Sequence, residues 1–358
     1  MVVANGCWIE DELWYWDLAR RALCALSIKS GMISVKFMDI LYPGYKVFAY
    51  GEKMFVTCQH EERILIYHRC TGAAKEVYLQ DMQEGMRLYY PVQWEKHLYL
   101  VPAELKHQEI FRIDMETDDF IVMKEVASQL EQRNDSIAWN ARFLFPCVSD
   151  GVLWSAISYT KYYISYHLTT GELCVYQSEV SDSLWTVKCE KGTLYMTQTD
   201  SVNLIVKKQD EAERIIIVME GECAIKEPYS CIESLREYQV VLARKGRDIV
   251  VLNSESLECK TICLYEEAEE ESSGSRTIYC VEDETYIYVF PWQIENTYAI
   301  CKENWDVEQR DFRLDDISHL KYVLSLYFEN KEENEIVGEN AEVTLRDLCA
   351  YLANREET

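Results

Sequence analysis

The chain has 358 residues, of which 48% are hydrophobic and 12% aromatic, and its formal net charge is -26 at pH 7. This acidic charge repels phosphate backbones and anionic lipid, so we expect neither nucleic acid nor a membrane surface as a partner. The high content of apolar, β-branched and aromatic residues excludes a largely disordered chain and favours strands.

The segment 1–7 lacks the basic and apolar regions of a secretion signal, and the longest aliphatic run, at 215–219, is too short to span a bilayer. We therefore expect a cytoplasmic protein. The 14 cysteines are scattered among strand-like residues, as at Cys174, Cys189 and Cys263. We interpret them as reduced core residues and not as a disulfide framework.

Seven polar turns, each followed by a short strand of aliphatic and aromatic residues, recur along the chain. They lie at residues 10–12, 51–53, 94–97, 149–151, 190–192, 235–237 and 282–284. A second turn follows each of them about twenty residues later. These second turns lie at residues 29–31, 71–72, 114–117, 169–172, 209–211, 253–256 and 302–304. Two turns in each period of roughly 40 to 46 residues predict four antiparallel strands per repeat, which is one blade of a β-propeller.

The sequence thus predicts an all-β fold, a seven-bladed β-propeller over residues 1–314, with six or eight blades as alternatives. A short C-terminal strand or helix extension, residues 315–358, is expected to pack on the propeller. Residues 2–9 can supply the innermost strand of blade one, and residues 309–314 the outer strand of blade seven. Ring closure would then need no strand borrowed from the other terminus.

Three further segments carry predictions of their own. An insertion at residues 124–140 lengthens the connection between the third and fourth blades and can form a short helix. The apolar stretch 322–328 could instead join a terminal blade as a strand. Residues 344–352 have a candidate N-cap and apolar residues at helical spacing, which predicts a short helix on the outside of the propeller.

The repeat also carries a family resemblance. A hydrophobic strand, a polar loop, a strand ending near Asp or His and a Thr-Gly-like turn follow one another in it. This order resembles the bacterial β-propeller repeats related to WD40, kelch and quinoprotein-type blades, over residues 2 to about 314. The resemblance implies architecture only, because the double glycine of kelch blades and the Gly-His and Trp-Asp pairs of WD40 blades are missing. It transfers no ligand, chemistry or functional residue.

One hairpin carries the arrangement most like a metal site, with Cys58 and His60 on one strand and His68 and Cys70 on the other. If its loop covers residues 60 to 63, Cys58 lies opposite about Leu65 and the two pairs are several residues apart, so we expect no metal. The sequence contains no phosphate-binding loop, nucleophile elbow or zinc-protease helix. We therefore expect no cofactor.

The loops between the second and third strands of each blade should share one face with the connections between blades, around the central channel. Cationic and aromatic side chains gather in these loops although the whole chain is acidic. The candidate ligand-binding residues of this rim are Arg20, His60, Lys106, His107, Tyr159, Lys161, Arg244, Lys245, Arg247 and Trp292. Two interpretations stay open: the charges pair with acidic connections such as Glu84, Asp182 and Glu266, or they bind an anionic or mixed-charge ligand.

These features favour a non-catalytic binding or scaffold propeller that recognises a protein, peptide or glycan partner through its loop-rich face. The alternative is an enzyme acting on a carbohydrate or another small molecule at the channel mouth, with carboxylates such as Glu104 or Asp200 as acid or base. The sequence shows no recurrent catalytic pair, so it favours the interpretation without catalysis.

Overall fold

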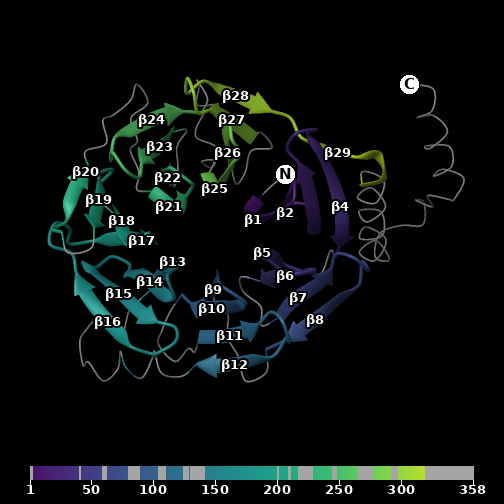
Figure 1. The fold of residues 1–358 in the computed structure, drawn as a ribbon, viewed down its shortest axis with the longest axis horizontal. Helices are drawn as coiled ribbons and strands as arrows, with labels where there is room; N and C mark the ends of the chain where they lie inside the picture. The colour runs from purple at the N-terminus through teal and green to yellow at the C-terminus, as the bar shows by residue number, and fades with distance from the viewer. Residues whose placement is uncertain are drawn as a thin grey trace, which may run out of the picture. The chain divides into compact units, whose positions relative to one another are not determined.

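The computed structural model describes most of the repeat region. The described residues are 3–39, 42–58, 63–79, 89–103, 110–123, 129, 142–199, 201–208, 211–216, 229–243, 248–264, 277–291 and 297–318. Within residues 1–315, their strands form sheets that are arranged in a ring (Figure 1), and the strands are antiparallel except for one short parallel strand. In each sheet the strands follow one another in sequence order.

The first three blades come from the N-terminal part of the chain. Blade one contains β1 (Val3–Ile9), β2 (Glu12–Asp17), β3 (Ala22–Ser27) and β4 (Met32–Met38). Blade two contains β5 (Gly44–Tyr50), β6 (Lys53–Cys58), β7 (Arg63–His68) and β8 (Ala74–Tyr78). Blade three contains β9 (Tyr89–Trp94), β10 (His97–Pro102), β11 (Ile110–Asp114) and β12 (Phe120–Met123).

The remaining blades complete the ring. Blade four contains β13 (Phe143–Ser149), β14 (Val152–Ile157), β15 (Tyr162–His167) and β16 (Leu173–Gln177). Blade five contains β17 (Leu184–Glu190), β18 (Thr193–Gln198), β19 (Leu204–Lys208) and β20 (Arg214–Ile216). Blade six contains β21 (Tyr229–Ser234), β22 (Tyr238–Ala243), β23 (Asp248–Asn253) and β24 (Cys259–Cys263). Blade seven contains β25 (Thr277–Glu282), β26 (Tyr286–Pro291), β27 (Thr297–Cys301) and β28 (Val307–Arg310).

The first strand of each blade lies nearest the centre of the ring and the fourth lies at its periphery (Figure 1). Within the described residues the sheets number seven, so the fold is a seven-bladed β-propeller. This confirms the predicted all-β class and the preferred blade count.

The predicted polar turns are the hairpins of the blades. The first set joins the first and second strands, and the second set joins the third and fourth strands. At Asp150 and Gly151, φ is 50° and 74°, and at Lys191 and Gly192 it is 48° and 75°. Positive φ at both central residues defines a type I′ turn, whose twist matches that of the flanking strands. The turn residues therefore specify the strand pairing locally.

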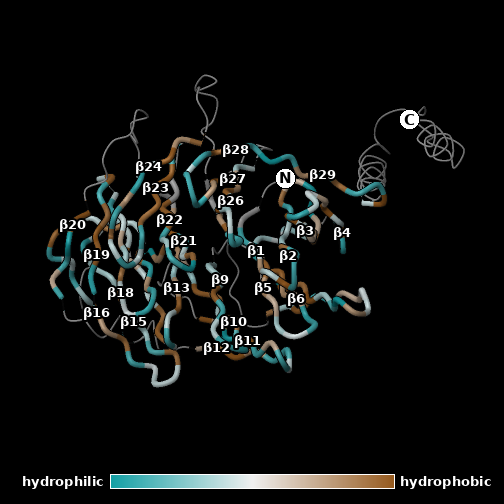
Figure 2. Tube along the Cα trace, turned by 45° about the horizontal axis from the view of Figure 1, so that its top comes forward, coloured by the Kyte–Doolittle hydropathy of each residue, from teal (hydrophilic) through white to brown (hydrophobic). Residues whose placement is uncertain are grey.

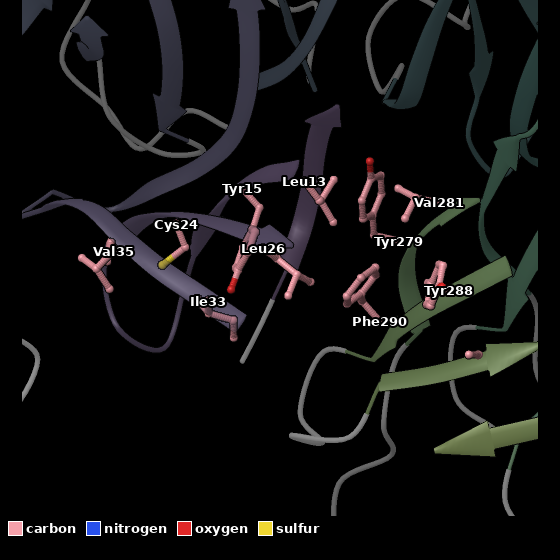
Figure 3. Close-up of a cluster of buried hydrophobic side chains, with 12 residues drawn as sticks. Leu13, Tyr15, Cys24, Leu26, Ile33, Val35, Tyr279, Val281, Tyr288 and Phe290 are labelled. Carbon is pink, nitrogen blue, oxygen red and sulfur yellow. The ribbon is translucent and has the colours of Figure 1, made fainter. Parts of the chain in front are cut away.

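The hydrophobic core is divided into layers between blades. Within the described residues, the buried apolar side chains form seven clusters, and each cluster lies between two neighbouring blades. Figure 2 shows hydrophobic residues along the strands of the ring. In the layer between blades one and seven, Leu13 and Tyr15 face Val281 and Phe290 (Figure 3). Each blade therefore needs both of its neighbours to bury its two faces.

Ring closure differs from the prediction. The outer strand of blade seven ends at Arg310, and a further strand, β29 (Arg313–Leu314), runs parallel to β4 of blade one. Arg313 N donates to Gly31 O at 2.9 Å, and Leu314 packs against the core between blades one and seven. The expectation that residues 309–314 form one strand of blade seven is therefore wrong. The open edge of β4 offers backbone partners, and burial of Leu314 favours using them.

The chain divides into two compact units, residues 1–315 and 316–358. The predicted strand at 322–328, the predicted helix at 344–352 and the packing of the extension lie outside the described residues and stay predictions. The insertion at 124–140 also lies outside them, apart from Gln129. Among the described residues, no helix has the length and apolar character needed to cross a membrane. The expected cytoplasmic location stays a prediction.

Candidate functional site

The two faces of the ring carry different connections. Because neighbouring strands alternate in direction, the loops between second and third strands share one face with the connections between blades. We call this the loop face, and we call the opposite face, with the two hairpins of each blade, the hairpin face. Arg20 lies in the β2–β3 loop, and Tyr159 and Lys161 lie in the β14–β15 loop, so these three predicted residues share the loop face. The other predicted rim residues fall outside the described residues: His60, Lys106, His107, Arg244, Lys245, Arg247 and Trp292.

Arg20 is engaged within its own loop. Its Nη1 donates a hydrogen bond to Oδ2 of Asp17 at 2.6 Å, and the Asp17 side chain is fully buried. The other carboxylate oxygen of Asp17 accepts from the backbone N of Ala19 at 3.0 Å. The charge of Arg20 therefore supports the conformation of the β2–β3 loop. Asp17 belongs to the same blade as Arg20.

Tyr159 presents an aromatic ring on the loop face. It is 60% exposed and has a positive φ of 61°, which is uncommon for a residue other than glycine. Its ring packs edge-on against Trp185, with ring centroids 5.5 Å apart. Tyr159 N donates to Leu184 O at 3.0 Å, and Leu184 N donates to Thr160 O at 2.7 Å. Because these residues begin the innermost strand β17, the contacts hold an exposed ring beside the channel mouth; we call this pair of rings the Tyr159–Trp185 platform.

The innermost strands are irregular near the loop face. The pairing register shifts close to the first residues of β1, β5, β13, β17, β21 and β25. A β-bulge inserts an extra residue and changes the direction in which neighbouring side chains point. In β17 the shift falls at Trp185, and in β5 it falls between Gly44 and Lys46. The bulges thus shape the mouth of the channel.

Among the charged residues on innermost strands, three influence one another: Lys46 on β5, Lys188 on β17 and Glu233 on β21. Blade two lies across the ring from blades five and six (Figure 1). Lys46 nonetheless interacts electrostatically with both Glu233 and Lys188, and Lys188 interacts with Glu233. The three residues lie on the innermost strands of blades two, five and six, and each is half-buried. We call them the channel cluster.

The strand register places the cluster members at different depths. Lys188 pairs with Tyr195 and Glu233 pairs with Val240, which are equivalent positions of their hairpins. Lys46 pairs with Thr57, two positions closer to the loop face. With a rise of about 3.3 Å per residue, its Cα lies about 7 Å nearer that face. A ligand entering from the loop face would thus meet Lys46 first.

Asn5 of β1 fixes the backbone beside Lys46. Its Oδ1 accepts from Val47 N at 2.7 Å, and its Nδ2 donates to Val47 O at 3.4 Å. Val47 is fully buried, so these two bonds satisfy backbone groups that water does not reach. They join the innermost strands of blades one and two without strand pairing.

Asn5→Ala should therefore lower the free energy of unfolding by about 2 kcal/mol, because a buried donor and a buried acceptor lose their partner. Chemical denaturation of the full chain measures the change. Asn304→Ala is the control, since Asn304 is exposed in the β27–β28 turn, and it should cost less than about 1 kcal/mol. Equal losses in the two variants would contradict the role given to Asn5.

Cys147 of β13 bonds the backbone on either side of Lys188, as Asn5 bonds the backbone next to Lys46. Its Sγ accepts from Cys189 N at 3.2 Å and donates to Val187 O at 3.7 Å. Burial raises the pKa of Cys147, so its sulfur stays a neutral thiol that can donate this bond. Both channel lysines therefore sit on strand segments that a neighbouring blade holds in place.

The two lysines differ in how far nearby negative charge offsets the cost of burying their ammonium groups. Burial lowers the pKa of Lys46, and the attraction of Glu233 offsets this only in part. Burial also acts to lower the pKa of Lys188, but nearby negative charge, chiefly that of Glu233 with a contribution from Glu190, outweighs it and the pKa is raised. The ammonium charge of Lys46 is thus the less well compensated of the two.

Sequence reasoning missed the channel cluster. Lys46 follows a tyrosine and precedes a valine, and Lys188 stands between a valine and a cysteine. A charged residue alternating with apolar ones is also typical of a strand with one solvated face. One signal in the sequence could have pointed to these residues. Each of their strands is the first strand of its blade, and the first strand lies at the centre of the ring and not at the solvent-exposed periphery.

The hairpin with the metal-like residues shows a register different from the predicted one. Val56, and not Cys58, lies opposite Leu65. Cys58 is buried and Cys70 is exposed, and His60 lies outside the described residues. Within the described part of the chain, no three Cys, His, Asp or Glu side chains come together as metal ligands.

The hairpin face has a groove of about 570 Å³ between blades six and seven. Its lining residues are Tyr238, Val251, Asn253, Ser256, Glu258, Cys259, Lys260 and Trp305. The ring of Trp305 is contacted by Tyr238, with centroids 5.5 Å apart, and by Nζ of Lys260 at 5.3 Å. The aromatic surface of the groove is thus used within the protein, and the loop face with its channel is the stronger candidate site.

No protein-family model matches the chain, and no curated protein matches it. Solved structures match it in fold. YCF48 from Cyanidioschyzon merolae aligns with a TM-score of 0.60 and 8% identity, over 81% of this chain and 92% of that chain. A catalytically inactive virginiamycin B lyase from Staphylococcus aureus with quinupristin aligns with a TM-score of 0.59 and 11% identity, over 81% and 92%. YCF48 bound to D1 peptide aligns with a TM-score of 0.58 and 6% identity, over 82% and 91%.

Identities this low establish the fold alone. The chain is a β-propeller protein, and the predicted resemblance to propeller repeats is confirmed at the level of architecture.

Proposed function

We propose that the protein is a non-catalytic binding propeller that receives a peptide segment of a protein partner on its loop face. The observation that carries the proposal is the Tyr159–Trp185 platform, in which an exposed ring with left-handed backbone is fixed beside the channel mouth. Backbone strain of this kind concentrates at binding sites, and aromatic side chains contribute strongly to recognition. The fold is compatible with the role, since YCF48, which is similar in fold, has been solved with a D1 peptide.

Selection of peptides from a display library against the immobilised protein, followed by affinity measurement, tests the proposal. Tyr159→Ala should weaken the selected peptides by roughly tenfold or more, because the exposed ring is lost from the contact. Tyr78→Ala is a matched control, since Tyr78 is 61% exposed against 60% for Tyr159 and lies on the peripheral strand β8. Selected peptides that bind the Tyr159→Ala variant as tightly as the wild type would refute the proposed site.

The alternative function is an enzyme with its site at the channel mouth. Its named carboxylates, Glu104 and Asp200, lie outside the described residues. Nothing in the described part of the chain favours catalysis over binding.

A further inference from the structure

The groove on the hairpin face between blades six and seven contains two perpendicular aromatic rings. The ring planes of Tyr238 and Trp305 meet at 84°, and their centroids are 5.5 Å apart. Aromatic faces carry partial negative charge, so two rings at this angle form a corner that attracts a cation. The groove has a volume of about 570 Å³, which lies within the range of known ligand pockets. It therefore has the size and the aromatic lining of a cation-binding site.

A cation already lies over one of these rings. Nζ of Lys260 is 5.3 Å from the centroid of the Trp305 ring. Among the described residues Lys260 forms no ion pair, and its side chain is exposed. A lysine has a flexible four-carbon stem, so the ammonium group can leave the ring by rotation about its side-chain bonds. The ring of Trp305 thus accepts an ammonium group that is free to exchange.

The groove also contains a carboxylate. Glu258 lines it, is exposed and forms no ion pair with another described residue. Burial raises the pKa of the Tyr238 hydroxyl, and the negative charge of Glu237 and Glu282 raises it further. Negative charge therefore surrounds the two rings, which favours a positively charged ligand over an anion.

Trp305 occupies a backbone position at which three other blades carry glycine. Its φ is 68°, and in the equivalent turns Gly31, Gly72 and Gly171 have φ values of 71°, 70° and 72°. In all four turns the N–H of this residue donates to the carbonyl four residues earlier. Left-handed backbone is unfavourable for a residue with a side chain, and such strain concentrates at binding sites. The turn itself does not require a tryptophan, so the strain indicates a role for the ring.

We propose that this groove binds the trimethylated ammonium group of a lysine side chain in a partner protein, which replaces Lys260 on the Trp305 ring. A primary ammonium is strongly hydrated, whereas a trimethylated ammonium has no N–H to donate to water. Exchange returns the ammonium of Lys260 to water and brings the more weakly hydrated cation onto the aromatic faces. Glu258 supplies the opposing charge.

The shape of the groove favours a side chain of a partner over a free small molecule. Ser256, Glu258 and Lys260 line the groove and are exposed, whereas sites for free small molecules bury most of the ligand surface. The net charge of -26 also attracts a cationic segment toward the protein. The groove lies on the face opposite the Tyr159–Trp185 platform. The inference therefore goes beyond the proposed function and does not depend on it.

Calorimetric titration of the full chain with small probes tests the site without any partner. The probes are N-acetyl-trimethyllysine amide, N-acetyl-lysine amide, and choline with its uncharged tert-butyl analogue. We expect the trimethyllysine probe to bind roughly fivefold or more tightly than the lysine probe. Both carry the same charge, so general attraction to the acidic chain cancels between them. Choline should bind more tightly than its analogue but less tightly than the trimethyllysine probe; the reverse order of choline and trimethyllysine would overturn the choice of a partner side chain.

Variants locate the binding in the groove. Trp305→Leu should weaken the trimethyllysine probe by roughly fivefold or more. Leucine fits this turn, since Leu257 holds the equivalent position of blade six with a φ of 60°. Lys260→Gln should tighten the probe, because the ring face is then empty. Lys29→Gln is the control: it removes the same charge from an exposed turn of the hairpin face and should leave the affinity unchanged.

Three results would overturn the inference: equal binding of the trimethylated and unmethylated probes, unchanged affinity in a folded Trp305→Leu variant, or weaker or unchanged binding in the Lys260→Gln variant. Thermal unfolding of each variant separates lost binding from lost folding. If Trp305→Leu unfolds, Lys260→Gln still decides, because it alters only an exposed side chain. Peptides selected for the loop face depend on Tyr159 and not on Trp305, so either proposal can fail while the other holds.

Discussion

Gly44→Ala should lower the free energy of unfolding by about 3 kcal/mol, through overpacking between blades one and two. A Cβ at this position would lie 2.6 Å from Cδ2 and Cε2 of the Trp16 ring. Trp16 is 1% exposed, and its ring packs edge-on against Tyr42 with centroids 5.5 Å apart. Since the indole is enclosed, it can move aside only by opening the layer between the blades.

Chemical denaturation of the full chain measures the loss, and Gly51→Ala is the matched control. Gly51 has a φ of +55°, which costs an alanine about 1 kcal/mol, but no atom lies within 4 Å of the added Cβ. The two variants thus separate backbone strain from steric overlap. A loss at Gly44 no greater than that at Gly51 would show that Trp16 accommodates the methyl group.

Tyr42→Phe should also cost about 3 kcal/mol, although only one oxygen is removed. The Tyr42 hydroxyl donates to Val56 O at 2.6 Å and accepts from Leu65 N at 2.8 Å. Val56 and Leu65 are paired residues of β6 and β7, and all three are buried. A phenylalanine would leave one buried N–H and one buried carbonyl without this partner, and each would carry a desolvation penalty.

The control for this variant is Tyr78→Phe. Tyr78 is 61% exposed and its hydroxyl donates to Glu76 Oε2 at 2.9 Å, so water can replace the lost bond. We expect a change below about 0.5 kcal/mol. If both phenylalanine variants were equally stable relative to wild type, the hydroxyl of Tyr42 would have no structural role.

The sequence predicts the blades well because residues close together in the chain determine each turn and the strands that it joins. A turn such as Asp150-Gly151 adopts positive φ with few neighbours involved, and the flanking apolar strands pair once the turn forms. The number of turns therefore gives the number of blades. The closing strand β29 was misplaced because its partner Met32 lies far away in sequence, and no local pattern specifies that pairing.

The candidate site depends more on long-range geometry. The loop positions of Arg20, Tyr159 and Lys161 follow from the repeat, and the structure places all three on the predicted face. Lys46 and Glu233 lie in blades two and six, so the electrostatic effect of Glu233 on Lys46 depends on closure of the ring and not on any one repeat. The spacing of charged residues along the sequence therefore cannot predict which charged residues of different blades interact.

The parallel strand β29 gives the molecule a defined order of completion during synthesis. Blade one has all four of its own strands once residue 38 has been made, but the outer edge of β4 gains its last partner only at Leu314. Until then, the apolar face of blade one that contains Leu13 and Leu26 waits for blade seven. Blade one is therefore completed only after blade seven has been made, and its outer edge and one of its apolar faces stay uncovered while the blades between them are synthesised.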